Sequence, residues 1–378
     1  MSLTREIKDF ALDIGYARVG ITTADDFSDH IQEVQGRGTT YDFYVQDPRQ
    51  FLHGARPRLT MPTARSIISL VWDYAQHSFP ETLVGKVGRI YQSRCYNAPP
   101  DRINGARLHL MLDFLRKKGC TVGSGIILPE RRAAARAGTA RFGRNTFAHA
   151  KHIGSFILLV SIVVDAELEY DCPSLEVPCP KGCTRCMDAC PTQAIQAPMQ
   201  LNPRRCLAFN AWWTQEGRPC VTSTIPRELR AAMGTRVHGC DACQEACPRN
   251  AAKLKSVLPA DPFLEQLAER FSLPGMLEMP DSFRTEVVQP IMYNYIKDKK
   301  YFQRNAAVAL GNTGDPEHVP ILGRAMEHPE EIVRSHAAWA LGRIGGAQAR
   351  ALLETARRRE EASQVQEELS SALETIRG

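Results

Sequence analysis

The chain has 378 residues, 43% of them hydrophobic and 24% charged, with a formal net charge of +5. This length predicts two or three domains, and the charge permits a nucleic-acid partner without requiring one. No apolar stretch reaches the ~18 residues of a membrane helix, and the opening MSLTREIKDF lacks the apolar core of a secretory signal. We therefore expect a cytoplasmic protein, whose twelve cysteines favour metal binding over disulfides.

The first 170 residues mix the periodicities of helices and strands, which predicts an α/β domain. Helices are expected at Leu3–Ile14 and Asn104–Lys118, and strands at Gly15–Ile21, Ser66–Tyr74, Cys120–Leu128 and Ser155–Val164. Neither a GxGxxG motif nor a P-loop occurs. The sequence therefore does not indicate a dinucleotide or a nucleoside triphosphate.

Residues 171–255 differ sharply in composition from what precedes them. Ten of the twelve cysteines lie between Cys172 and Asn250, among many prolines and only short periodic segments. Such a region cannot be held by apolar burial alone, so bound metal must replace part of its core. We predict a ferredoxin-like domain here.

Residues 256–378 contain an internal repeat. The stretch Gln303–Gly311 (QRNAAVALG) recurs as Arg334–Gly342 (RSHAAWALG), and the residues between the copies supply a partner helix. Stacked helix pairs with this period are typical of HEAT repeats. The final stretch, residues 356–378, predicts one or two helices that cap the stack.

The cysteines form two runs, and each run ends in Cys-Pro. In bacterial ferredoxins the cysteine before proline binds the other cluster of the pair. One [4Fe–4S] cluster would thus take Cys179, Cys183, Cys186 and Cys247, and the second would take Cys190, Cys206, Cys240 and Cys243. Two zinc sites are the alternative, although C-x2-C-x3-C-P is not a zinc-ribbon spacing. Cys172 could replace Cys179, because the gap after Cys179 holds three residues where two are usual.

With these motifs the chain resembles the epoxyqueuosine reductases, cobalamin-dependent iron–sulfur enzymes related to reductive dehalogenases. The similar segments include IKDFALDIGYARVGI, ARPRLTMPTARSIISLVWDY, RAAARAGTARFGRNT and HAAWALGRIG. The resemblance implies a multidomain α+β chain in which residues 1–170 hold a base-off cobalamin against the ferredoxin-like domain. It also implies that the helical tail grips the anticodon arm of a tRNA.

The family reaction removes the epoxide oxygen of epoxyqueuosine to give queuosine. The resemblance implies that electrons pass through the two clusters to cobalt. Because no flavin, nucleotide or second metal motif is present, the clusters need a terminal redox partner, and cobalamin can be one. We also expect an external low-potential electron donor and a monomer.

The sequence departs from the family around the expected substrate site. By our alignment Ser124 stands where the family has an acid, and a hydroxyl is a poor general acid at neutral pH. The family segment R-x-D-Y-H is here Arg94-Cys95-Tyr96-Asn97. The candidate catalytic residues are therefore Ser124, Cys95 and Tyr96. By resemblance the candidate cobalamin contacts are Arg94, Arg141, Arg144 and Asn145.

Three functions follow from this combination of retained clusters and altered substrate residues. The first is a reductase of this family whose substrate has diverged. The second is an electron carrier that reduces or reactivates a corrinoid partner without a substrate of its own. The third is a relative that binds RNA or a corrinoid without turnover.

Overall fold

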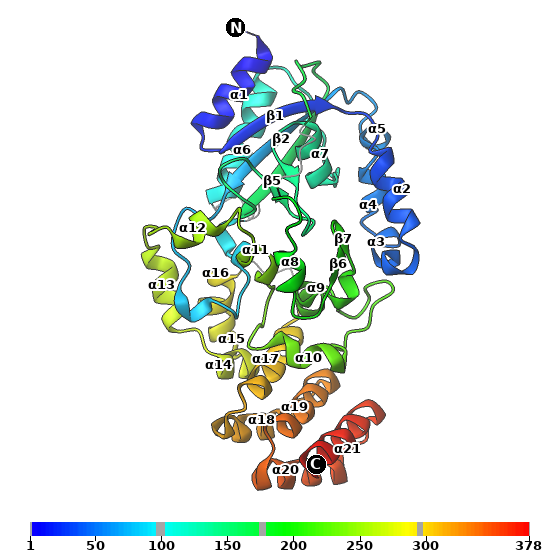
Figure 1. Ribbon diagram of the computed structural model, residues 1–378, viewed down its shortest axis with the longest axis vertical. Helices are drawn as coiled ribbons and strands as arrows, with labels where there is room; N and C mark the ends of the chain where they lie inside the picture. Colours follow the sequence, from blue (N-terminus) through cyan, green and yellow to red (C-terminus); the bar gives the residue numbers. More distant parts are fainter. Residues whose placement is uncertain (1, 96–102, 174–178, 293–297, 378) are drawn as a thin grey trace.

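The computed structural model describes residues 2–95, 103–173, 179–292 and 298–377. Figure 1 shows three parts along the long axis: a sheet with helices at the N-terminal end, a cysteine-rich middle, and a stack of helices at the C-terminal end. No described helix is long and apolar enough to cross a membrane. The architecture is the predicted multidomain α+β type.

The N-terminal part is built on a three-stranded antiparallel sheet. Its strands are β1 (Arg18–Thr23), β2 (Ser66–Asp73) and β5 (Ile157–Val164), in the order β1-β2-β5. In the register Ile68 of β2 lies opposite both Ile21 and Ile162. The predicted strands at the beginning of the chain, at 66–74 and at 155–164 are confirmed.

Helices cover both faces of this sheet, which explains why the central strand is apolar almost throughout. Ile68 and Leu70 of β2 belong to one core with Ile7 of α1 (Leu3–Asp13) and Met111 of α6 (Ile103–Lys117). The alternate side chains of β2 pack with alanines of α7 (Glu130–Arg136) on the opposite face. The sheet is thus fixed from both sides and holds α7 in place.

The strand predicted at Cys120–Leu128 is absent. Only Val122 makes a bridge to Val164, and the chain then leaves the sheet. Gly125 has a φ of +71°, which an extended strand residue cannot adopt. The prediction was wrong because Ile126 and Leu128 pack against a small core beside the sheet, while Ile127 is exposed.

The remaining N-terminal elements are short and lie in two excursions from the sheet. Between β1 and β2 come α2 (Ser28–Gly36), the 3₁₀ turn η1 (Gly38–Thr40), α3 (Asp42–Val45), α4 (Phe51–Gly54) and α5 (Pro57–Thr60). After β2 come η2 (Glu81–Leu83), η3 (Arg89–Tyr91), η4 (Ser93–Cys95), and later the hairpin of β3 (Arg141–Phe142) and β4 (Ala148–His149).

The cysteine-rich middle consists of short elements joined by loops, as its composition predicts. They are α8 (Arg185–Asp188), the hairpin β6 (Ile195–Ala197) and β7 (Gln200–Leu201), η5 (Pro203–Arg205), α9 (Leu207–Trp212), α10 (Arg227–Met233), α11 (Ala242–Glu245) and α12 (Ala251–Lys255). Elements this short are not stable alone.

The C-terminal part is helical, and both repeat copies fall within long helices. The elements are α13 (Pro262–Glu269), α14 (Leu273–Glu278), α15 (Asp281–Phe283), the π-helical turn η6 (Arg284–Val288), α16 (Gln289–Ile291), α17 (Lys300–Thr313), η7 (Pro316–His318), α18 (Val319–Ala325), α19 (Glu331–Ile344), α20 (Gly346–Arg359) and α21 (Ser363–Arg377). The predicted helix pairs and the two capping helices are confirmed.

Glycines let the three long repeat helices approach closely. A methyl group on Gly311 of α17 would lie 2.7 Å from the Cα of Ala340 in α19, and one on Gly342 would lie 2.8 Å from the Cα of Ala372 in α21. The repeated A-L-G ending is therefore a packing motif. One apolar core continues from the sheet through residues 83–95 into these helices. The cysteine-rich middle therefore lies between the apolar sheet domain and the apolar helices.

Candidate redox site and adjoining cleft

The first group of thiols comes together across the two cysteine runs. Cys179, Cys183, Cys186 and Cys247 line one small cavity, so the last cysteine of the second run lies beside the first three of the first run. Burial raises the pKa of the Cys186 thiol, and the nearby thiols of Cys179 and Cys247 raise it further. The crossed ligation that the Cys-Pro pattern predicts requires these four thiols to lie close together.

The four cysteines of the second group, Cys190, Cys206, Cys240 and Cys243, also lie near one another. Burial raises the pKa of the Cys243 thiol. The nearby thiols of Cys206, Cys240 and Cys190 raise this pKa further. In the described part of the chain, no three side chains of His, Cys, Asp or Glu lie close enough to hold a single metal ion. A cubane cluster takes four thiolates, which is the number in each group.

Backbone amides face the sulfurs of both groups. The N–H of Arg144 donates to Cys179 Sγ at 3.3 Å, and the N–H of Ala194 donates to Cys190 Sγ at 3.1 Å. Such donors stabilise the negative charge of a thiolate ligand and tune a bound cluster. The donor set therefore fits two iron–sulfur clusters.

Arg144 and Asn145, in the turn between β3 and β4, contact the loops that carry the cysteines. The Arg144 guanidinium donates to the carbonyl oxygen of Cys183 at 2.8 Å, and the Asn145 amide donates to that of Cys243 at 3.3 Å. Adjacent residues thus tie the β3–β4 turn to both cysteine groups. Arg141 lies on β3 opposite His149.

The segment that carries Cys206 is held by a buried arginine that sequence analysis missed. Arg304 on α17 is fully buried, and its guanidinium donates to the carbonyl oxygens of Thr214 at 2.8 Å and Asn210 at 3.0 Å. These carbonyls lie at the C-terminal end of α9, which begins next to Cys206, and a cation is favourable at such an end. The repeat QRNAAVALG contains this arginine, but nothing in the pattern marks it as a partner of the cysteine-rich loop.

A cleft of about 560 Å³ is lined by residues of the β3–β4 turn, the same turn whose Arg144 and Asn145 contact the cysteine loops. Its walls come from three places: the α2–α4 excursion, the start of α7, and the β6–β7 hairpin with the β3–β4 turn. Aromatic side chains form much of the wall, namely those of Tyr41, Phe43, Tyr44, Phe51 and Phe142. A concave, largely apolar site with a few polar groups is the usual form of a cofactor or substrate pocket, and the volume lies in the usual range.

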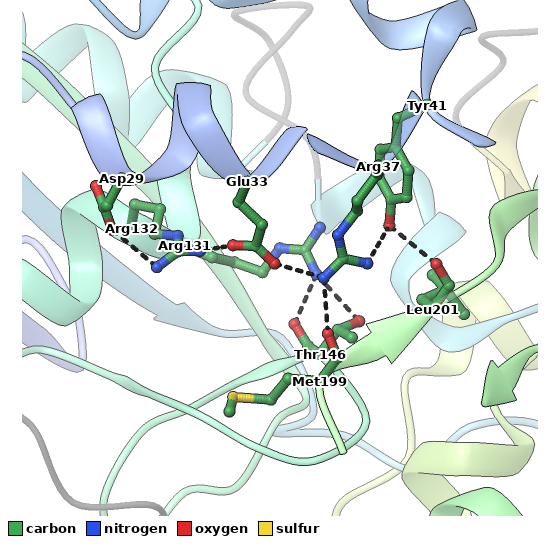
Figure 2. A network of polar contacts seen from close by, with 9 residues as sticks. All are labelled: Asp29, Glu33, Arg37, Tyr41, Arg131, Arg132, Thr146, Met199 and Leu201. Carbon is green, nitrogen blue, oxygen red and sulfur yellow. Dashed lines mark hydrogen bonds and ion pairs between the residues drawn. The ribbon is translucent and has the colours of Figure 1, made fainter. Parts of the chain in front are cut away.

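A polar network fastens the excursion across this cleft (Figure 2). Arg132 of α7 pairs with Asp29 at 2.9 Å and with Glu33, and Glu33 also pairs with Arg37. Arg37 in turn donates to the carbonyl oxygen of Met199 at 3.1 Å in the hairpin. Arg132 thus pairs with carboxylates of the protein and is not freely solvated.

Arg131 is the cation that remains available in the cleft. Its side chain is exposed there and donates to the carbonyl oxygen of Thr146 at 2.6 Å (Figure 2). No carboxylate among the described residues pairs with it. An exposed guanidinium without an acidic partner can receive an anionic or carbonyl group of a ligand.

The predicted catalytic residues are scattered in this structure. Ser124 is exposed on the loop before α7, three residues before Ile127 on the cleft wall. Cys95 is fully buried in the large apolar core, with its thiol facing the carbonyl oxygen of Arg89, which favours packing over a role in the cleft. Tyr96 lies outside the described residues. Arg94 belongs to η4, and its side chain is likewise outside them.

Comparisons with known proteins agree with this geometry. Residues 179–250 match the family model of the 4Fe-4S double cluster binding domain, and residues 292–374 match that of HEAT repeats. The epoxyqueuosine reductase of Escherichia coli is 30% identical over 359 residues, which cover 90% of this chain and 89% of the relative. This chain belongs to the epoxyqueuosine reductase family.

Other members of the family match over nearly the whole chain. The epoxyqueuosine reductase of Bacillus subtilis is 28% identical over 99% of this chain and 96% of the relative. A crystal structure of an epoxyqueuosine reductase with an epoxyqueuosine-modified tRNA-Tyr stem loop superposes with a TM-score of 0.84 at 28% identity, covering 100% of this chain and 99% of that one. Another structure, from Bacillus subtilis, has its catalytic Asp loop swung out of the active site and gives a TM-score of 0.83.

The family match settles the nature of the middle domain. It is a double [4Fe–4S] domain, and the helical tail is a HEAT-repeat domain, as the sequence predicts. The chain is therefore an oxidoreductase.

Proposed function

We propose that this protein reduces epoxyqueuosine in tRNA to queuosine. The observation that carries the proposal is that one turn, β3–β4, contacts both groups of four cysteines and lines the cleft, in a chain that aligns end to end with epoxyqueuosine reductases. Two one-electron clusters next to one pocket suit a two-electron reduction. The electrons come from an external low-potential donor.

We infer the cluster ligands from the two thiol groups. Cys179, Cys183, Cys186 and Cys247 bind one cluster, and Cys190, Cys206, Cys240 and Cys243 bind the other. Crossed ligation explains how segments separated by some sixty residues fold as one unit. We place the domain boundaries near residues 170 and 255, where β5 and α12 have just ended.

The cleft fits a cobalamin in kind. Its aromatic wall suits a flat macrocycle, and Arg131 offers donors to peripheral amides or a phosphate. Arg141, Arg144 and Asn145 lie on the β3–β4 turn beside it, with Phe142 and Thr146 of the same turn on the cleft wall. When bound, cobalamin would supply the reducing chemistry of a low-valent cobalt centre.

The tRNA stem loop would lie between the cleft mouth and the HEAT-repeat domain. The solved relative with a bound stem loop superposes over the whole chain, HEAT helices included. The last turn of α20 carries Arg357, Arg358 and Arg359, a basic group suited to phosphates. Ser124 lies three residues before Ile127 of the cleft wall, and its proposed role is to donate a hydrogen bond to the substrate without serving as an acid.

The test is an anaerobic assay of the purified protein with cobalamin, a chemical reductant and an epoxyqueuosine-containing stem loop. We expect about eight irons per chain, a change in the cobalamin spectrum on binding, and conversion to queuosine. Eight irons with no cobalamin uptake and no turnover would favour the electron-carrier alternative. A matched control omits cobalamin, which separates cofactor-dependent turnover from slow chemical reduction.

A further inference from the structure

A carboxylic acid lies in the cleft, and the family comparison assigns it no role. Glu130 is the first residue of α7, it lines the cleft beside Arg131, and its side chain is partly buried. It follows directly on the loop that carries Ser124. This places an acid six residues after Ser124, which by our alignment stands where the family has an acid.

The contacts of Glu130 are unusual for an acid among arginines. Ser161 of β5 donates to its carboxylate twice, through its hydroxyl and through its backbone N–H at 3.3 Å. Arg131 instead reaches Thr146, and Arg132 reaches the carboxylates of α2. Among the described residues no Lys, Arg or His pairs with Glu130, so nothing there compels the carboxyl to stay ionised.

The surroundings of Glu130 favour its neutral form. Burial raises its pKa to about 7, and this effect outweighs the two bonds from Ser161, which lower the pKa. Several other ionisable groups surround α7. The strands packed against it carry Arg18, Asp73, Arg141 and His149. The facing wall of the cleft carries His30, Glu33, Arg37, Tyr41 and Tyr44. An acid that holds its proton near neutral pH is suited to general acid catalysis.

We propose that Glu130 donates the proton that the epoxide oxygen needs as its bond to carbon breaks. The inference rests on the proposed function and deepens it by assigning the acid that Ser124 cannot replace. The hydroxyl of Ser161 holds the carboxyl in position and stabilises the carboxylate that remains.

The step balances as follows. Removing an epoxide oxygen breaks two C–O bonds, forms a C=C bond, consumes two electrons and two protons, and releases water. The external donor supplies the electrons one at a time through the clusters. Glu130 gives its proton to the oxygen as the first C–O bond breaks, takes a new one from solvent, and water or Glu130 again protonates the departing hydroxide.

The decisive variants are Glu130→Gln and Ser161→Ala. Gln keeps the size and one acceptor oxygen for Ser161 but cannot donate an acid proton, so turnover should fall by ~10²–10⁴-fold while iron content stays unchanged. In the wild type, turnover should decline as pH rises through about 7, because the acid form is lost. Ser161→Ala removes a bond that lowers the pKa, so the decline should move to higher pH; a merely structural role would not move it.

Glu167→Gln is the matched control, since this exposed glutamate pairs only with exposed Arg65 among the described residues. Infrared difference spectra between wild type and Glu130→Gln give a readout without turnover: the protonated-carboxyl band should persist up to about pH 7. A band that vanishes near the ordinary ~4.3 of glutamate, or full turnover in Glu130→Gln, would overturn the inference. Wild-type protein that leaves epoxyqueuosine unreduced would overturn the proposed function, while the band would still decide whether Glu130 holds its proton.

Discussion

The cysteine-rich middle and the HEAT-repeat end are held together by different means. The middle has short elements, frequent prolines and thiols that face shared cavities, so its stability depends on what the sulfurs bind. The end has long helices, such as α17, whose residues are almost all buried against apolar neighbours. The comparison teaches that loss of metal and loss of packing should damage different parts of one chain.

The largest effect is expected from Cys247→Ala. This change removes a ligand from the first thiol group, so about four of the eight irons should be lost and turnover abolished. Iron analysis and the visible spectrum measure it. Cys220→Ala and Cys172→Ala should keep all the iron; loss of iron in Cys172→Ala with retention in Cys179→Ala would reverse the ligand assignment.

Arg304→Met tests the join between the two regions. The change leaves several buried carbonyl oxygens of the α9 segment without a donor, so unfolding free energy should fall by roughly 3–5 kcal/mol. Urea unfolding of the anaerobic protein measures the loss. The exposed Arg343 on α19 is the matched control, and Arg343→Met should be nearly neutral. Equal effects in both variants would mean that Arg304 does not join the regions.

The pH dependence of stability should reveal a buried histidine near the middle region. Burial lowers the pKa of His149 to about 4, so the folded state keeps it neutral while the unfolded chain takes up a proton near 6.5. Stability is therefore fully present above pH 6.5 and is lost as pH falls towards 4, by up to roughly 3 kcal/mol. His149→Gln should flatten this slope in urea unfolding, and an unchanged slope would contradict the assignment.

The smallest effect is expected from Gly311→Ala in the repeat helices. A new methyl group would press on the backbone of Ala340, so the free energy of unfolding should fall by about 1–3 kcal/mol while iron content stays unchanged. Thermal unfolding followed by circular dichroism measures it. Gly36→Ala is the control, because nothing lies within 4 Å of that position and the change should be neutral or slightly stabilising.

Sequence patterns predicted the elements whose causes lie close together in the chain. Examples are the apolar run of β2, the A-L-G repeat and the two Cys-Pro runs. Each of these patterns can be recognised within a few residues, because helix, strand and cluster geometry fix the local spacing of side chains. The crossed grouping of the cysteines was predicted from the four thiolates that each cluster needs. The strand expected at Cys120–Leu128 failed because the pattern of apolar residues hid the turn at Gly125.

Tertiary structure alone decided the cleft and its acid. Glu130 gains its partly buried setting from Ser161 of a distant strand, and the adjacent Arg131 and Arg132 leave it unpaired because they turn towards Thr146 and α2. Arg304 likewise acts on carbonyls some ninety residues away. The sequence by itself determined which metal clusters the chain can carry, because the number and spacing of the cysteines decide which cluster their thiols can bind. Only the fold determined where a proton can be held, because that depends on burial and on neighbours brought from distant parts of the chain.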